Sequence, residues 1–357
     1  MTKVFRPTLL PPVDWSRWIG ARLPVQAVRQ NRREPFLDPD MYAERFGDFV
    51  PRIKKVTNKV PQQIEAGAGA LFTATQQRLL DTLNWMTLQY SAGAPVTQIQ
   101  EIWPYAMRWA EEYGLFHEAH HQDPENQGGI VPHAALRTED YWNIALRLLC
   151  LGLLTGYADQ TERVVRFLDY GNELMGVRDG LIERFVSPFI PARGPLPDAA
   201  SRHLPYRKLF KVFSAREEDR ARLIAGYLDE WYEASRREPY FDQHLHGGFG
   251  FYGYWSFEAG VATWILDIDD SSFREKFFYP KDLVDFARSL PRPAALAAQP
   301  ESSGARLRCE AGYPCPREGY WFTPAKTDSR RFFKQGELMP AFESQYGATI
   351  WQWDEQQ

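Results

Sequence analysis

The stretch from Tyr254 to Leu266 constrains the fold more than any other, because it is apolar on nearly every side of the helix it would form. A helix that is apolar all round has to be surrounded by other elements, so we expect this one at the centre of the core. Glu258 is the charged exception within it. An unpaired carboxylate there would be costly, and we therefore expect Glu258 to be hydrogen-bonded or paired with an arginine.

The pattern from Thr73 to about Arg288 is mostly helical. Apolar residues recur at helical spacing around the sequence Thr97-Gln98-Ile99-Gln100, which spells a capping box. Two further stretches pair a capping residue with acids in the first helical turn, and these are Thr138-Glu139-Asp140 and Ser214-Ala215-Arg216-Glu217. The sequence therefore predicts a mainly α fold, a domain of many helices.

The pattern changes at Pro291. Residues 291–304 are rich in Pro, Ala and Ser and lack apolar periodicity, which is typical of a linker. Three short β-rich runs follow, namely Tyr320–Thr323, Arg331–Lys334 and Ala348–Trp353. We therefore predict an α-helical domain over residues 1–290, a linker over 291–304 and a small three-stranded β-rich module within 305–357.

Composition excludes several classes of protein. The chain has 42 basic and 46 acidic residues, a formal net charge of −4, which argues against direct nucleic-acid binding. Three cysteines do not make a disulfide framework. The most apolar stretch, Ile144–Leu154, is too short for a membrane span, and residues 1–20 lack the apolar core of a signal peptide. We expect a cytoplasmic protein that does not bind membranes.

His117-Glu118-Ala119-His120-His121 matches H-E-x-x-H, in which two histidines one helical turn apart hold zinc and the glutamate activates water. A catalytic helix would continue past the second histidine, but Asp123-Pro124 ends this one. We therefore expect no bound metal. The alternative hypothesis is a zinc metallohydrolase built on His117, Glu118 and His121.

Gly248 to Gly253 matches G-x-G-x-x-G, a dinucleotide-binding pattern that requires a preceding parallel strand. Gln243–His246 does not have the character of a strand, and the aromatic residues between the glycines would crowd a pyrophosphate. We expect a packed bend and no cofactor. Cys309 and Cys315 lack a second pair of ligands and are expected to be packed thiols. The chain thus shows no convincing set of catalytic residues.

Acidic residues concentrate between residues 215 and 290, where 9 basic and 15 acidic residues give a net charge of −6. The local clusters are Asp229, Glu230 and Glu233 within one predicted helix, and Asp267, Asp269 and Asp270 after the apolar helix. Asp229 and Glu233 share a helix face, and we expect the aspartates to be exposed at a helix end. Such acids fit either a solvated surface or a surface that attracts a basic partner.

Several longer motifs resemble the PoNi family, the immunity proteins for PoNe-type DNase toxins and related polymorphic toxins of bacteria. The residues that carry the resemblance are Arg137–Trp142 with Leu148-Leu149, Tyr252–Gly260, Asp267–Phe273 and Tyr279–Leu283. The tail from Cys315 to Asp354 is similar to the C-terminal extension of larger polymorphic-toxin immunity proteins.

The resemblance implies an α-helical antitoxin without catalytic residues, which binds a toxin of type VI secretion or contact-dependent competition and blocks it. Nuclease toxins bind phosphate through basic surfaces, so an acidic face can compete for the same surface. We therefore expect the toxin to be a nuclease that contacts Asp229, Glu230, Glu233, Asp267, Asp269 and Asp270. Besides the metallohydrolase, a secretion adaptor or chaperone for an effector is a further alternative.

Overall fold

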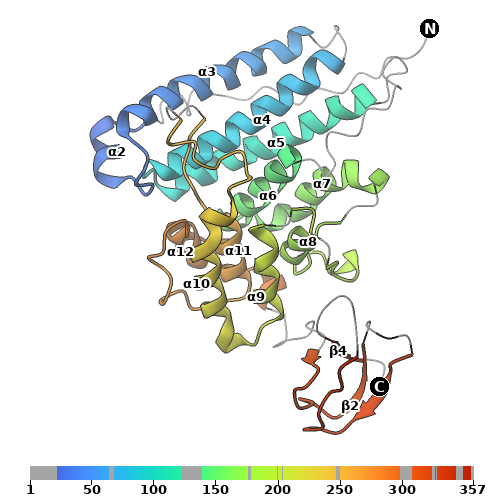
Figure 1. The fold of residues 1–357 in the computed structure, drawn as a ribbon. Helices are drawn as coiled ribbons and strands as arrows, with labels where there is room; N and C mark the ends of the chain where they lie inside the picture. The colour runs from blue at the N-terminus through green and yellow to red at the C-terminus, as the bar shows by residue number, and fades with distance from the viewer. Residues whose placement is uncertain are drawn as a thin grey trace, which may run out of the picture. The chain divides into compact units, whose positions relative to one another are not determined.

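The computed structural model describes residues 22–63, 68–121, 139–175, 178–198, 200–202, 204–246, 250–297, 308–323, 326, 328–342 and 349–354. The chain divides into two compact units, Met1–Ala297 and Ala298–Gln357. The first unit is helical and the second contains an antiparallel sheet. This is the mainly α fold with a small β-rich part that the sequence predicts (Figure 1).

The first helices of unit 1 form a layer. A short helix, α2 (Val25–Asn31), precedes α3 (Pro39–Gln63), α4 (Ala68–Ser91) and α5 (Val96–His121). Helix α3 packs along α4, and α4 packs along α5, as the blue to cyan ribbons show (Figure 1). Among the described residues, no helix is both long enough and apolar enough to cross a lipid bilayer.

Helix α6 (Glu139–Leu154) contacts α4, α5, α7, α11 and α12, and α8, α9 and α10 pack further out against α11 and η5. Helices α5 and α6 approach closely where Trp103 donates its indole N–H to the Leu148 carbonyl over 2.8 Å. The other elements are η3 (Ala158–Gln160), α7 (Thr161–Met175), α8 (Gly180–Val186), η4 (Pro191–Arg193), η5 (Tyr206–Leu209), α9 (Phe210–Ser214), α10 (Glu217–Ala234), α11 (Phe257–Ile265), α12 (Lys281–Ser289) and α13 (Ala294–Ala297).

Helix α11 confirms the predicted central helix, because all of its residues are buried. It begins at Phe257, later than the predicted Tyr254. Gly253 has a positive φ of 115°, and the Ser256 amide donates to the Phe278 carbonyl over 2.8 Å. These features keep the preceding segment out of the helix, although Tyr254 is itself buried.

Two residues predicted to cap helix N-termini, Ser214 and Thr97, do not do so. Helix α10 begins at Glu217 with Arg216 at its N-cap, and Ser214 instead ends α9. Helix α5 begins at Val96, which places Thr97 inside its first turn. Acids in the first turn of α10 offset the missing cap, because negative charge is favourable at a helix N-terminus. The cap predicted at Thr138 lies outside the described residues.

Unit 2 holds a four-stranded antiparallel sheet where the sequence predicts three strands. Its strands are β1 (Arg308–Glu310), β2 (Gly319–Phe322), β3 (Arg331–Phe333) and β4 (Ile350–Trp353), in the order β1-β4-β2-β3. Strand β1 was missed because its three residues, two of them charged, have little β character. The buried core of this unit consists of Cys309, Cys315, Trp321, Phe333, Met339 and Trp351. Both thiols are therefore packed, and burial raises their pKa values.

The first half of the predicted linker belongs to unit 1. Arg292 donates to the carbonyls of Trp264 and Ile265 at the end of α11, over 3.3 and 3.2 Å. Leu296 in α13 is buried against the core of unit 1. Unit 1 thus extends beyond the predicted boundary at residue 290, to Ala297.

We expect brief trypsin treatment to cut first after Arg306, two residues beyond the predicted linker of 291–304, and to spare Arg292. The packed contacts of Arg292 and Leu296 should protect residues 291–297, because proteases cut backbone that has few partners. Mass spectrometry of the first fragments gives the site. A first cut at Arg288, in α12, would contradict this boundary.

Glu34 connects the N-terminal helices to the segment that precedes α11. Its carboxylate accepts the backbone N–H of Tyr254 over 2.7 Å and that of Phe36 over 3.1 Å. The side chain is buried, and the loss of hydration raises the pKa of Glu34 to about 7, against the effect of both hydrogen bonds. Next to it, Arg33 donates to the carbonyls of Tyr90 and Ala94, each over 2.8 Å.

The raised pKa of Glu34 predicts a pH dependence of stability. Between its ordinary value of 4.5 and about 7 the folded chain binds more protons than the unfolded chain, so the free energy of unfolding falls as pH rises. Glu34→Gln removes this titration, so its free energy of unfolding should rise by up to about 3 kcal/mol relative to that of wild type between pH 4.5 and pH 7.5. Urea denaturation at several pH values measures this difference. Parallel pH profiles for the two proteins would refute it.

Candidate binding surface

The first predicted acidic cluster lies on the C-terminal half of α10, where Asp229, Glu230 and Glu233 are all exposed. Two of these acids have intramolecular partners. The Lys276 ammonium lies 2.5 Å from the Asp229 carboxylate, and Lys208 pairs with Glu230. Such exposed ion pairs contribute little to stability, on the order of 0–1 kcal/mol each. The acids therefore remain accessible to a charged partner.

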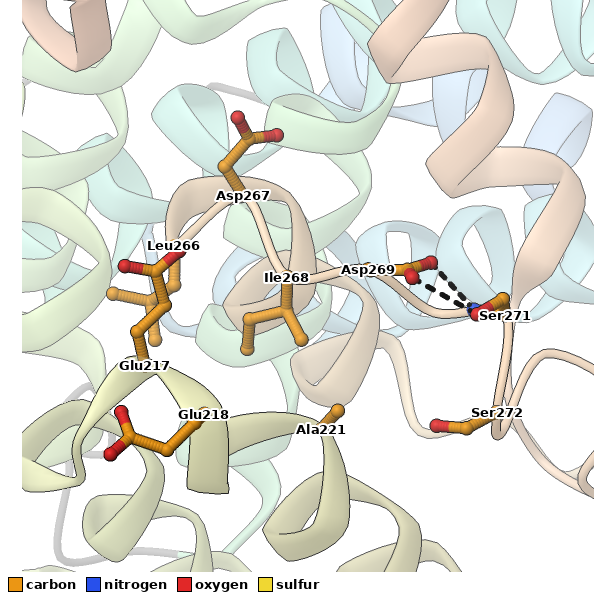
Figure 2. A pocket seen from close by; sticks show the side chains of 9 residues that line it. All are labelled: Glu217, Glu218, Ala221, Leu266, Asp267, Ile268, Asp269, Ser271 and Ser272. Atoms are coloured by element: carbon orange, nitrogen blue, oxygen red, sulfur yellow. Dashed lines mark hydrogen bonds between the residues drawn. The ribbon is translucent and has the colours of Figure 1, made fainter.

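The second cluster borders a surface hollow of about 500 Å³. Its residues are Glu217, Glu218, Ala221, Leu266, Asp267, Ile268, Asp269, Ser271 and Ser272. Figure 2 shows Glu217 and Glu218 extending from the start of α10 on one side, and Asp267 and Asp269 on the loop after α11 on the other. The hollow thus carries carboxylates on both sides.

Asp269 and Asp267 are exposed, as predicted. Asp269 accepts the backbone N–H and the hydroxyl of Ser271, each over 3.0 Å, and the backbone hydrogen bond in particular lowers the pKa of Asp269 (Figure 2). Asp267 adopts a left-handed backbone conformation with φ of 52°, and its carboxylate lies 3.7 Å from the Arg292 guanidinium. Both carboxylates therefore lie exposed at the rim of the hollow.

The prediction that Asp270 is exposed is wrong, because only 5% of its surface is exposed. Its carboxylate accepts the Tyr279 hydroxyl over 2.8 Å and Arg288 over 2.9 Å. Arg274 lies further away, at 3.4 Å. A phenol and two guanidinium groups compensate for the lost hydration of this carboxylate. Asp270 consequently fixes the loop that carries Asp267 and Asp269, and it is not accessible to a partner.

The structure does not bring the two predicted clusters together. Glu217 and Asp229 are twelve residues apart on α10, a rise of about 18 Å. Instead, Asp267 and Asp269 lie opposite Glu217 and Glu218, which sequence reasoning did not select. The acidic first turn of α10 was visible in the sequence as a helix start. Which loop faces that turn depends on tertiary packing.

Glu258 determines how α10 lies against α11. Its Oε1 atom accepts three hydrogen bonds, from the Tyr227 hydroxyl and the Trp231 indole over 2.7 Å each and from the Ser256 hydroxyl over 2.8 Å. The expected hydrogen bonding of Glu258 is therefore present, through neutral donors. Burial raises the pKa of Glu258 above its usual value, although these hydrogen bonds act in the opposite direction.

The H-E-x-x-H motif falls at the end of α5, and its second histidine, His121, is the last residue of that helix. His117 is buried between the rings of Phe72 and Tyr113, with both centroids 5.9 Å away. The side chain of His121 lies outside the described residues. Within the part of the chain that the structure describes, no three His, Cys, Asp or Glu side chains gather in a way that could hold a metal ion.

The glycine-rich motif forms a bend that packs against α4. A Cβ atom on Gly253 would lie 2.0 Å from the Ser91 hydroxyl oxygen, so only glycine fits there. The Ser91 hydroxyl donates to the Tyr252 carbonyl over 2.7 Å and accepts the Trp255 indole N–H over 2.8 Å. The described part of the motif therefore serves close packing, and Gly248 lies outside it.

The fold is shared with a solved structure. It is similar to "The Crystal Structure of Protein PA2201 from Pseudomonas aeruginosa", with a TM-score of 0.60 and 19% sequence identity. The similarity covers 74% of this chain and 94% of that one. At this identity the comparison shows the fold alone. No curated protein matches the chain.

Residues 177–283, which run from just before α8 to the start of α12, match the family model of a class of non-enzymatic toxin inhibitors. The family is the PoNe immunity proteins (PoNi), C-terminal, and this stretch of the chain is a PoNi C-terminal domain. The match contains both acidic clusters and Glu258. It is narrower than the resemblance from Arg137 to Asp354 described above. It also favours inhibition over the metallohydrolase hypothesis.

The geometry of Glu258 predicts a difference between two substitutions. Glu258→Ala should lower the free energy of unfolding by about 2–5 kcal/mol, because it leaves a cavity and removes the acceptor of Tyr227 and Trp231. Glu258→Gln keeps an oxygen at that position and should cost much less. Urea denaturation followed by helical circular dichroism compares them. Equal losses for both variants would show that the acceptor is unimportant.

Proposed function

We propose that the protein is an immunity protein that binds and neutralises a cognate PoNe-type toxin in the cytoplasm of the cell that makes it. The observation that carries this proposal is the PoNi C-terminal match over residues 177–283, since the family implies immunity to a PoNe polymorphic toxin. We further propose that the toxin is a DNA-cleaving nuclease, delivered by type VI secretion or contact-dependent competition.

Charge supports a nuclease as the partner. A nuclease contacts the phosphates of its substrate through basic side chains, and inhibitor carboxylates can occupy the same side chains. The exposed acids of the matched domain include Asp229, Glu230, Glu233, Asp267 and Asp269, with Glu217 and Glu218 beside the last two. We propose the acids of α10 as the main contact surface, and those around the hollow as a second negative patch that steers the approaching toxin. Asp270, being buried, is excluded from this surface.

The direct test is a DNA-cleavage assay with the toxin encoded in the neighbouring reading frame. Adding one equivalent of the protein should abolish cleavage, and the two proteins should elute together. If the protein binds the toxin while cleavage continues, it is a secretion adaptor or chaperone, and the immunity proposal is wrong. Cells that express the toxin should survive only when the protein is co-expressed.

The double variant Asp229→Asn with Glu233→Gln should lower the association rate constant for the toxin about 3- to 10-fold at low salt. The two carboxylates share one exposed face of α10, and their steering effect should fade as salt screens it. Stopped-flow measurements at low and moderate salt give both rate constants.

The matched control changes two exposed acids outside the matched residues, Asp159→Asn with Glu162→Gln. It removes the same amount of charge, and its association rate should stay near that of wild type. An equal loss in both double variants would show that net charge alone matters, and the α10 surface would then be rejected.

A further inference from the structure

Phe277 is the most exposed aromatic side chain among the described residues of the matched domain. It lies on the loop between α11 and α12, and 70% of its surface is exposed. Keeping so large an apolar side chain in water is unfavourable, because burial removes its apolar surface from water. Single exposed apolar residues are common, so the exposure of Phe277 gains meaning only from what surrounds it.

The ring of Phe277 stands at the edge of a cluster of packed rings. Its centroid lies 6.1 Å from that of Phe278, which stacks on Tyr232 of α10 at 5.5 Å. Tyr232 in turn meets Tyr254 edge-on at 5.0 Å. Phe278 and Tyr232 are themselves partly exposed. The outer ring therefore stands on a base of packed aromatic rings, an arrangement that limits the entropy lost when such a side chain docks.

Two residues that contact the Tyr232 side chain have a left-handed backbone conformation. Phe278 has a φ of 69° and Asp242 a φ of 57°, in the left-handed region that is unfavourable for side chains and especially for bulky ones. Both residues contact Tyr232, Phe278 by ring stacking and Asp242 by accepting the Tyr232 hydroxyl over 2.6 Å. Strain of this kind collects at functional sites more often than elsewhere.

The acidic cluster of α10 lies directly beside this aromatic edge. Lys276, the neighbour of Phe277, pairs with Asp229 and so holds the loop against α10. Glu233 follows one turn later on the same helix face. On the other side of the ring, Glu275 is exposed and pairs with Lys281. An exposed ring bordered by carboxylates has the make-up of a binding surface with an apolar centre and a charged rim.

We propose that Phe277, supported by Phe278 and Tyr232, is the anchor of the toxin-binding surface. The ring fills an apolar recess on the toxin, and the basic side chains around that recess meet Asp229 and Glu233. This inference rests on the proposed function and adds the residue that holds the complex together. Three exposed acids at this rim, Asp229, Glu233 and Glu275, outnumber the two lysines there, Lys276 and Lys281, so the rim favours a basic partner. The family match makes the cognate PoNe-type toxin that partner.

The test measures binding of the full-length protein to the catalytically inactivated toxin from the neighbouring reading frame. Phe277→Ala should raise the dissociation constant at least 10-fold, mainly by raising the dissociation rate. A buried anchor acts mainly on the dissociation rate, whereas rim charges act mainly on the association rate. Phe277→Tyr keeps the ring and should bind within a few-fold of wild type. The matched control is Phe332→Ala, which removes an exposed ring from unit 2 and should bind like wild type.

The outcomes separate the two proposals. If wild type does not bind the toxin, the proposed function is wrong and the anchor with it. If wild type binds and protects while Phe277→Ala binds equally well, the immunity function stands and only the anchor is refuted. An equal loss in Phe277→Ala and Phe332→Ala would also refute the anchor. Circular dichroism confirms that each variant is folded, which an exposed position favours.

Discussion

The hydrogen bonds to the Glu258 carboxylate fix which face of α10 packs against α11 and which face is exposed. Tyr227 and Trp231 lie four residues apart on α10, so both reach the same buried oxygen from one face of that helix. With this face held against α11, the opposite face of α10 is exposed, and Asp229 and Glu233 lie on it. A buried polar contact therefore sets the orientation of the charged surface on the opposite side of the same helix.

The matched domain depends on residues far from it in sequence. The Glu34 carboxylate holds the Tyr254 amide, Arg33 pairs with Asp282 at the start of α12, and Ser91 accepts the Trp255 indole. These contacts connect the first helices of the chain to the bend before α11 and to α12. The aromatic base beneath Phe277 includes Tyr254, so the N-terminal helices support the proposed anchor although the family match begins only at residue 177.

Periodicity made the helical class and the buried helix α11 predictable, because both follow from local patterns of apolar residues. The motifs around α11 carried part of the family resemblance, and the match confirms the resemblance over residues 177–283. Asp270 shows where local reasoning ends. Asp270 follows the exposed Asp269 directly, and nothing in the sequence distinguishes the two. Its burial becomes favourable only because Tyr279 and Arg288, from later in the chain, donate hydrogen bonds to it. The exposure of Phe277 was missed for a related reason, because the sequence does not show whether an aromatic residue in a loop is buried in the core or exposed at the surface.

Gly226, at the middle of the outward side of α10, is exposed, and a Cβ atom placed on it would meet open space. The buried contacts that hold this helix, including the hydrogen bonds of Tyr227 and Trp231, lie on its other side. Substitutions along the outer side therefore leave folding almost untouched while they alter what a partner encounters. A lineage under pressure from a changing toxin can rewrite the recognising residues of α10 one by one, and the interior that supports them needs no matching revision.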